Sequence, residues 1–183
     1  MTKRSPVRRA PAPPRVVLQP LTAADGPTLF KWINDRDLVL FNAGYRPVHE
    51  PTHREWLAGL AGRRDLVAFA IRVKRTGRLI GVCQLTAIHP VNRSADLQIR
   101  IGEAASRGQG YGLEAVRLLL AFGFRDLNLH RIALQVFATN TRAIRTYERA
   151  GFRREGTLRD AVFIDGRYLD VLVMAVREGE FAG

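Results

Sequence analysis

A glycine-rich turn between an expected strand and an expected helix constrains this chain more than any other feature. The turn, Arg-Gly-Gln-Gly-Tyr-Gly at residues 107–112, follows the alternating apolar run 97–101 and precedes a helical segment that starts at Leu113. Glycine permits a tight turn and a close approach of the backbone to a ligand. The first N–H groups of a helix and its dipole attract anions. The order therefore predicts a phosphate cradle that suits a pyrophosphate, with neither P-loop nor dinucleotide-fold spacing.

A second motif follows about thirty residues later, after the strand-like run 132–136. Its main positions are three and four residues apart along one helix face: Asn140, Ala143, Ile144, Tyr147 and Gly151. Asn140 can cap or flank the helix start, and Gly151 supplies the left-handed residue that ends the helix. Ala143 leaves room for a slender ligand arm.

Together the two motifs resemble the signatures of the GNAT N-acetyltransferases. Arg107, Gly110 and Gly112 match R/Q-x-x-G-x-G/A, and residues 140–152 match N-x-x-A-x-x-x-Y-E-x-x-G-F. The resemblance spans roughly residues 16–176. It implies an α/β (α+β) fold with a mixed, mostly antiparallel, splayed central sheet flanked by helices. The ending at 154–171, a hairpin with Asp165-Gly166 at its tip, resembles the branch of ribosomal-protein, spermidine and amino-sugar acetyltransferases.

The resemblance implies direct transfer of acetyl from acetyl-CoA to a primary amine. Tyr147 is then the expected acid for the leaving thiolate, and a main-chain N–H in residues 99–101 is the expected oxyanion donor. Asp96 is a candidate general base, with a water chain as an equal alternative. The residues expected to bind acetyl-CoA are Ile99, Arg100, Ile101, Arg107, Gly108, Gln109, Gly110, Tyr111, Gly112, Asn140, Ala143 and Tyr147.

The acceptor is less well specified than the cosubstrate. Four carboxylates, Asp35, Asp37, Glu50 and Glu55, fall in the expected acceptor half, but the net charge of +12 disfavours a polycation. An acidic protein N-terminus or a nucleotide-linked amino sugar suits that charge better. Two non-enzymatic alternatives are an acyl-CoA sensor and a basic RNA-binding module. A homodimer is compatible with the sequence, which leaves the oligomeric state open.

Composition predicts one folded domain at 15–179, preceded by a basic, proline-rich, disordered tail at 1–14 that could touch RNA or a ribosome. The run 1–15 carries Lys3, Arg4, Arg8, Arg9 and Arg15 and no acidic residue. No apolar segment is long enough for a membrane span or a secretory signal, so the cytoplasm is the expected location. The single cysteine, Cys83, is expected to be a buried apolar residue. No metal is expected, because Pro51 separates His49 from His53 and interrupts their helical face.

The apolar patterning and turn signals also predict the remaining elements. A strand is expected at 16–18, and the capping pattern at 22–25 precedes a helix through Phe30, Trp32 and Ile33. A second helix is expected to start at Thr52, and the two helices should form the acceptor side. A hairpin is expected at 66–73 and 79–87, followed by a strand at 95–101 and a core helix bearing Leu113, Val116, Leu120 and Phe124.

Overall fold

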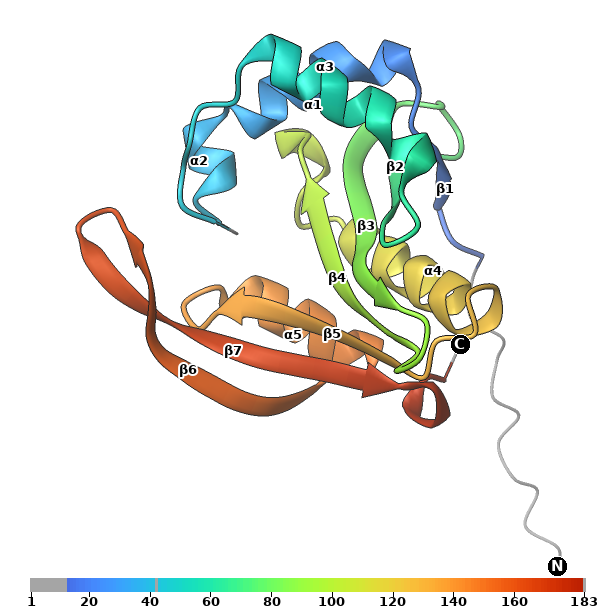
Figure 1. Ribbon diagram of the computed structural model, residues 1–183, viewed down its shortest axis with the longest axis vertical. Coiled ribbons are helices and arrows are strands. Elements are labelled where there is room, and N and C mark those ends of the chain that lie inside the picture. Colours follow the sequence, from blue (N-terminus) through green and yellow to red (C-terminus); the bar gives the residue numbers. More distant parts are fainter. Residues whose placement is uncertain (1–12, 42, 183) are drawn as a thin grey trace, which may run out of the picture.

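A seven-stranded sheet forms the centre of the molecule, in the order β1-β2-β3-β4-β5-β7-β6 (Figure 1). The computed structural model describes residues 13–41 and 43–182. Every neighbouring pair of strands is antiparallel except β4 and β5. The strands are β1 (Val16–Pro20), β2 (Val67–Val73), β3 (Leu79–His89), β4 (Ser94–Ile101), β5 (Arg131–Phe137), β6 (Arg153–Ile164) and β7 (Arg167–Arg177). The helices are α1 (Gly26–Ile33), α2 (Arg36–Val39), α3 (Glu50–Gly59), α4 (Tyr111–Arg125) and α5 (Thr141–Ala150). The predicted mixed, mostly antiparallel sheet with flanking helices is confirmed.

Both predicted hairpins form where the turn residues indicated. The β2–β3 connection contains Gly77 at φ 67°, and the β6–β7 tip is Asp165-Gly166, with φ 52° and 80°. Positive φ at both central residues matches the twist of a two-residue hairpin turn, which is why Asp-Gly is favoured there.

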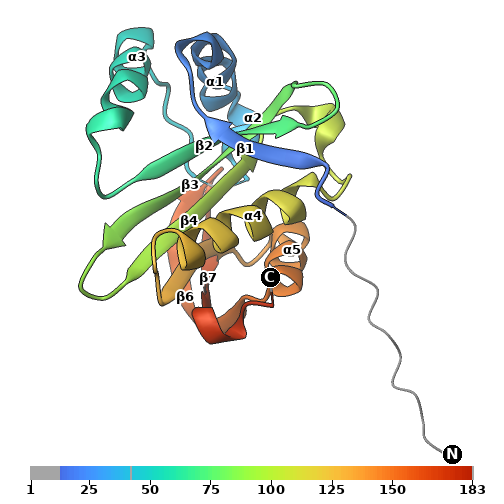
Figure 2. The same cartoon turned by 90° about the vertical axis from the view of Figure 1, so that its right-hand side faces the viewer.

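Helix α4 packs against the sheet through its predicted apolar face. Leu113, Val116, Leu120 and Phe124 are all buried. Gly123 sits so close to β5 that a Cβ there would meet the Ile132 side chain at 2.6 Å. On the sheet, Cys83 is 1% exposed, as predicted, and burial raises the pKa of its thiol. Figure 2 shows α4 and α5 on one side of the molecule and α1 and α3 at the opposite end.

The capping pattern at the start of the first helical segment is present as predicted. The Asp25 carboxylate accepts hydrogen bonds from the Thr22 main-chain N–H at 2.9 Å and from its hydroxyl at 3.0 Å. The other Asp25 oxygen pairs with Arg72 at 2.6 Å. This buried ion pair therefore ties the entry of α1 to strand β2.

The predicted start of the second helix is wrong. Helix α3 begins at Glu50 rather than Thr52, with His49 as its N-cap and Pro51 in its first turn. Proline is tolerated there because its missing N–H would have no helical partner. The His53 N–H even donates to the His49 carbonyl at 3.0 Å, so Pro51 does not interrupt the helix between them.

The sheet splays between its two central strands. The parallel β4–β5 ladder contains only Ser94↔Arg131, Ala95↔Ile132 and Asp96↔Ala133. Beyond Asp96 the strands diverge, and Figure 1 shows the gap opening toward α1 and α2. The predicted splay between the strands that flank the glycine-rich turn is thus confirmed.

Two expectations concern the chain ends and membranes. The predicted tail at 1–14 lies almost wholly outside the described residues, which begin at Pro13. Within 13–41 and 43–182, no helix is both long and apolar enough to cross a bilayer.

Candidate active site

The glycine-rich turn leaves the N-terminus of α4 open to a ligand. Gly110 is the N-cap, at φ 87° in the left-handed region, and no side chain caps the helix. Gly108, at φ 77°, also adopts a conformation that favours glycine. No main-chain N–H of residues 108–113 donates a hydrogen bond to any described residue. Unsatisfied donors at the start of a 15-residue helix can bind an anion.

Two side chains of the turn brace it through hydrogen bonds to main-chain carbonyls. The Arg107 guanidinium donates to the carbonyls of Ile101 at 3.0 Å and Gly102 at 2.8 Å. Gln109 donates to the Ala105 carbonyl. Arg107 therefore links the turn to the end of β4, while the main-chain donors of the turn remain exposed.

Arg15 also contacts the turn, and no local pattern in the sequence predicted this contact. Its guanidinium donates to the Glu114 carboxylate and to the Gln109 carbonyl, each at 2.7 Å. The same group lies 4.7 Å from the centroid of the Tyr111 ring. Arg15, the residue before β1, therefore braces the glycine-rich turn and the start of α4.

The second motif forms helix α5 as predicted. The Asn140 side chain accepts from the Ala143 N–H at 3.1 Å, and its amide donates to the Phe41 carbonyl at 3.3 Å. Gly151, at φ 106°, ends the helix. Ala143 is half-buried and packs against the core cluster. Asn140 is thus a true cap that also holds the segment after α2.

Tyr147 lies on the inner side of α5, half-buried, with its ring 5.8 Å from Phe152 in an edge-on arrangement. Burial raises the pKa of Tyr147 to about 12. Its phenol lines the cavity described next.

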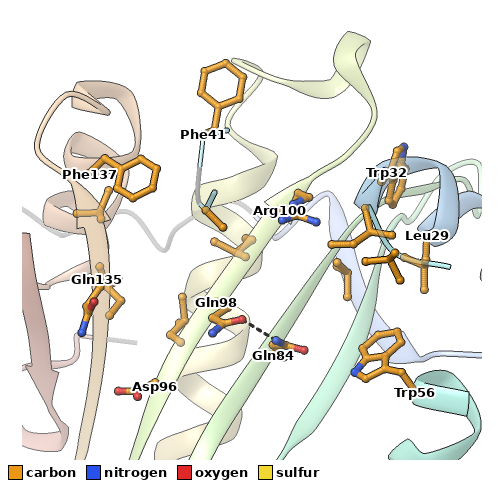
Figure 3. A pocket seen from close by; sticks show the side chains of 18 of the residues that line it. Leu29, Trp32, Phe41, Trp56, Gln84, Asp96, Gln98, Arg100, Gln135 and Phe137 are labelled. Atoms are coloured by element: carbon orange, nitrogen blue, oxygen red, sulfur yellow. Dashed lines mark hydrogen bonds between the residues drawn. The ribbon is translucent and has the colours of Figure 1, made fainter. Parts of the chain in front are cut away.

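A cavity of about 750 Å³ lies between β4, β5 and the helices α1 and α3 (Figure 3). Aromatic side chains line much of its wall: Trp32, Phe41, Trp56 and Phe137. Of the predicted site residues, it brings together Asp96, Ile99, Arg100 and Tyr147. The residues of the phosphate turn do not line it, so the predicted set divides between the cavity and the open N-terminus of α4.

One face of β4 supplies three of the polar side chains of the cavity. Successive strand residues point to opposite faces, so Asp96, Gln98 and Arg100 share the cavity side (Figure 3). Gln98 accepts a hydrogen bond of 2.7 Å from Gln84 on β3. Ile99 and Ile101, in contrast, pack against the main core. Arg100 was predicted as part of a cosubstrate-binding strand, whereas its side chain lies in the cavity.

Arg100 is electrostatically unusual among the described residues. Its Nε atom is buried without a hydrogen-bond partner, and none of the ion pairs among residues 13–41 and 43–182 includes its guanidinium. Desolvation lowers the pKa of Arg100.

Sequence reasoning missed several cavity residues. Trp32 and Trp56 belong to the helices expected on the acceptor side, but Phe41, His53, Gln84, Gln98, Gln135 and Phe137 had no assigned role. The alternation along β4 was a usable signal for Gln98. The positions of Phe41 and Phe137 depend on how α2 and β5 meet across the splay, which no local pattern encodes. In the described part of the chain, no group of three or more histidine, cysteine or acidic side chains could hold a metal ion.

Comparisons with known proteins agree with this geometry. The family model for the acetyltransferase (GNAT) domain matches residues 15–153. A spermidine N(1)-acetyltransferase of Vibrio cholerae is 38% identical over 103 residues, 56% of this chain and 59% of that protein. An uncharacterized N-acetyltransferase p20 of Bacillus licheniformis is 36% identical over 115 residues, 63% and 64% of the two chains. The chain thus spans less than two thirds of the length of these curated relatives.

A solved structure resembles the chain over more of its length. The crystal structure of spermidine N-acetyltransferase from Vibrio cholerae, in complex with CoA and spermine, matches with a TM-score of 0.84 and 28% identity. The match covers 92% of this chain and 99% of that one.

Proposed function

This chain belongs to the GNAT family of acetyltransferases, and from that premise we propose that it transfers acetyl from acetyl-CoA to a primary amine. One observation supports this most. An open helix N-terminus, a splayed sheet and a phenol with a raised pKa occur in one fold, at α4, at the β4–β5 gap and at Tyr147. A non-catalytic acyl-CoA sensor would not require the phenol.

The cosubstrate would span the two parts of the site. The main-chain N–H groups of residues 108–112 would hold its pyrophosphate at the start of α4. The pantetheine arm would then enter the gap where β4 and β5 diverge, beside half-buried Ala143. A main-chain N–H in residues 99–101 would stabilise the oxyanion.

The reaction requires that a proton leave the nitrogen and that one reach the sulfur. The amine attacks the thioester carbonyl, the carbon–sulfur bond breaks, and CoA departs as a thiolate. A phenol with a pKa of about 12 stays protonated at neutral pH, so Tyr147 can donate a hydrogen bond to that thiolate. The thiol pKa is roughly 8.5 by analogy with cysteine, so full transfer from Tyr147 alone is unfavourable. Tyr147 would therefore relay a proton that comes ultimately from the amine.

Asp96 is the proposed general base, with a water chain as the alternative. Its exposed carboxylate lines the cavity on the same strand face as Gln98. Replacing Asp96 with Asn should lower the rate and alter its pH profile. An unchanged rate and profile would assign the role to water.

Release of free CoA tests the proposed function directly. The full chain is incubated with acetyl-CoA and a panel of amines: dipeptides, amino sugars, polyamines and aminoglycosides. Amine-dependent CoA release is the expected result. Binding of CoA without release in the presence of any amine would favour the sensor alternative.

We also propose that residues 1–14 act as an RNA-contacting segment of a cytoplasmic enzyme. Lys3, Arg4, Arg8 and Arg9 give this segment positive charge without a compensating acidic residue. Deleting residues 1–14 should then weaken association with ribosomes in a salt-dependent manner. Equal association before and after the deletion would remove the proposal.

A further inference from the structure

We propose that Arg100 forms an anion-binding subsite in the acceptor half of the cavity, so that the accepted amine also carries a carboxylate or phosphate group. The inference rests on the proposed function and narrows its acceptor class. The starting observation is energetically unfavourable: the Arg100 guanidinium lies in a largely apolar cavity and has no partner among the described residues.

The surroundings of Arg100 explain why this cost is real. Val82 lies directly across from it on β3, and Leu29 and Trp32 of α1 line the same cavity. Arg100 as a whole is half-buried, and its Nε atom has no contact with solvent and no acceptor. Burying a charged donor without an acceptor is strongly unfavourable, so native proteins rarely retain one without a purpose. An anionic ligand would supply the missing acceptor.

The chemistry of the side chain restricts the ligand. A guanidinium presents its donors as a planar fork that matches the paired oxygens of a carboxylate or phosphate. Because the cavity is lined mainly by apolar and aromatic groups, an ion pair formed there is screened less than one in water.

The second charge of the cavity lies on the same strand. Asp96 is the one carboxylate among the described residues that line the cavity. It is four residues from Arg100 on the same face of β4, about 13 Å along the strand at about 3.3 Å per residue. Figure 3 shows the two side chains at opposite ends of the row, with Gln98 between them. This arrangement complements a molecule with an ammonium at one end and an anion at the other.

The same charges disfavour a polyamine. A polyamine carries several ammonium groups along its length and would place one of them near an unneutralised guanidinium. The acidic residues expected on the acceptor side, Asp35, Asp37, Glu50 and Glu55, do not line the cavity. Arg100 therefore favours amines that carry an anionic group over polyamines.

Matched acceptor pairs test the inference through CoA release. Two C-terminally amidated dipeptides, Ser-Glu and Ser-Gln, are compared with each other, and glucosamine 6-phosphate with glucosamine, so that only one member of each pair carries an anionic group. Spermidine is measured beside them. A charge-assisted hydrogen bond predicts a kcat/KM about tenfold higher for the anionic member of at least one pair. The pair that responds identifies the anion as carboxylate or phosphate.

Variants then assign the preference to one side chain. Arg100→Met keeps much of the length and removes the charge, so the ratio within the responding pair should fall to about one while the KM for acetyl-CoA is unchanged. Arg100→Lys should keep part of the preference, since it retains charge without the fork. Arg75→Met, in the exposed β2–β3 turn, is the matched control and should retain the full ratio.

Several results would overturn the inference. Equal kcat/KM values within both pairs in the wild-type chain would do so, even if Arg100→Met failed to fold. So would a higher kcat/KM for spermidine than for every anionic acceptor, or a preference that survives in Arg100→Met.

Calorimetry separates failure of the subsite from failure of the proposed function. Ser-Glu and Ser-Gln are titrated into the CoA-loaded chain. Arg100-dependent, tighter binding of Ser-Glu without any CoA release would support the subsite and contradict acetyl transfer. Amine-dependent CoA release with equal binding of the two dipeptides would support acetyl transfer and contradict the subsite.

Discussion

Tyr147 differs from an ordinary tyrosine because burial raises the pKa of its phenol to about 12. If its protonated form assists the leaving thiolate, activity should not fall as pH rises from 7 to 10, since the phenol keeps its proton over that range. An ordinary phenol, with a pKa near 10, would already be half ionised at the upper end. The pH dependence of kcat for the wild-type chain measures this. A loss of activity centred near pH 10, absent from a Tyr147 variant, would contradict it.

Tyr147→Phe should lower kcat by about two to four orders of magnitude, as expected when a proton-transfer group is removed. The affinity for acetyl-CoA should change little, because the ring and its packing on Phe152 remain. Steady-state kinetics beside a direct measurement of CoA binding separates the two effects. A large loss of binding with kcat retained would assign Tyr147 a structural role.

Gly102 shows how one missing side chain shapes the wall of the cavity. A Cβ on Gly102 would overlap the Trp32 indole, which is 6% exposed and packs directly on this part of the backbone. Gly102→Ala should therefore destabilise the fold by about 1–3 kcal/mol through overpacking. Gly59→Ala is the control, because nothing lies within 4 Å of its Cβ, and should be neutral or stabilising. Chemical unfolding of both variants checks the difference, and equal stabilities would contradict the tight contact.

At the scale of single elements, the phosphate turn depends on the left-handed residue that starts α4. Gly110→Ala places a side chain on a residue at φ 87°, which strains the turn, and its Cβ lies 3.1 Å from the Arg15 guanidinium, which must move slightly. The backbone cost is about 1–2 kcal/mol, and we expect CoA affinity to fall about tenfold if the main-chain donors lose alignment by a similar free energy. Titration of CoA by calorimetry measures this.

Gly77→Ala provides the control for that experiment. Gly77 also has a positive φ, at 67°, and has nothing within 4 Å of its Cβ. It should lower stability by a similar amount while CoA affinity stays unchanged. Weakened CoA binding in both variants would indicate a general loss of structure rather than a local effect at the turn.

The elements were predictable wherever local chemistry determines them. The glycines of the phosphate turn, the Asn140 cap and the Asp165-Gly166 tip each need a particular residue at a particular backbone conformation, so the sequence reveals them. The start of α3 was placed two residues late because Thr52 and Glu55 have the spacing of a capping box, whereas the helix begins at Glu50 with a proline in its first turn.

The cavity was harder to predict than the elements that surround it. It forms where α1, α2, α3, β4 and β5 meet, and the contact between Asn140 and the Phe41 carbonyl joins residues 99 positions apart. The isolation of Arg100 depends on which residues are absent from its surroundings, and a sequence does not display that.

At the scale of the whole molecule, the net charge of +12 should assist capture of an anionic cosubstrate. Salt screens such attraction, with a Debye length of about 10 Å at 0.1 M and 3 Å at 1 M. The KM for acetyl-CoA should therefore rise severalfold when salt is increased from about 50 mM to about 500 mM. Kinetics at fixed pH measures this, with thermal unfolding as a check that the fold is unaffected. A KM that does not change with salt would indicate that acetyl-CoA is bound through short-range contacts at the turn, without long-range attraction by the net charge.

The short ladder between β4 and β5 has a consequence for how the two halves of the sheet hold together. Three residue pairs join β4 to β5, which is fewer than the pairs that join the strands of the β3–β4 and β6–β7 hairpins. The pantetheine arm of acetyl-CoA, lying in the gap, would occupy the space where β4 and β5 are not paired. Bound acetyl-CoA would then hold the two halves of the sheet together. Release of CoA as product would leave them joined by the short β4–β5 ladder alone.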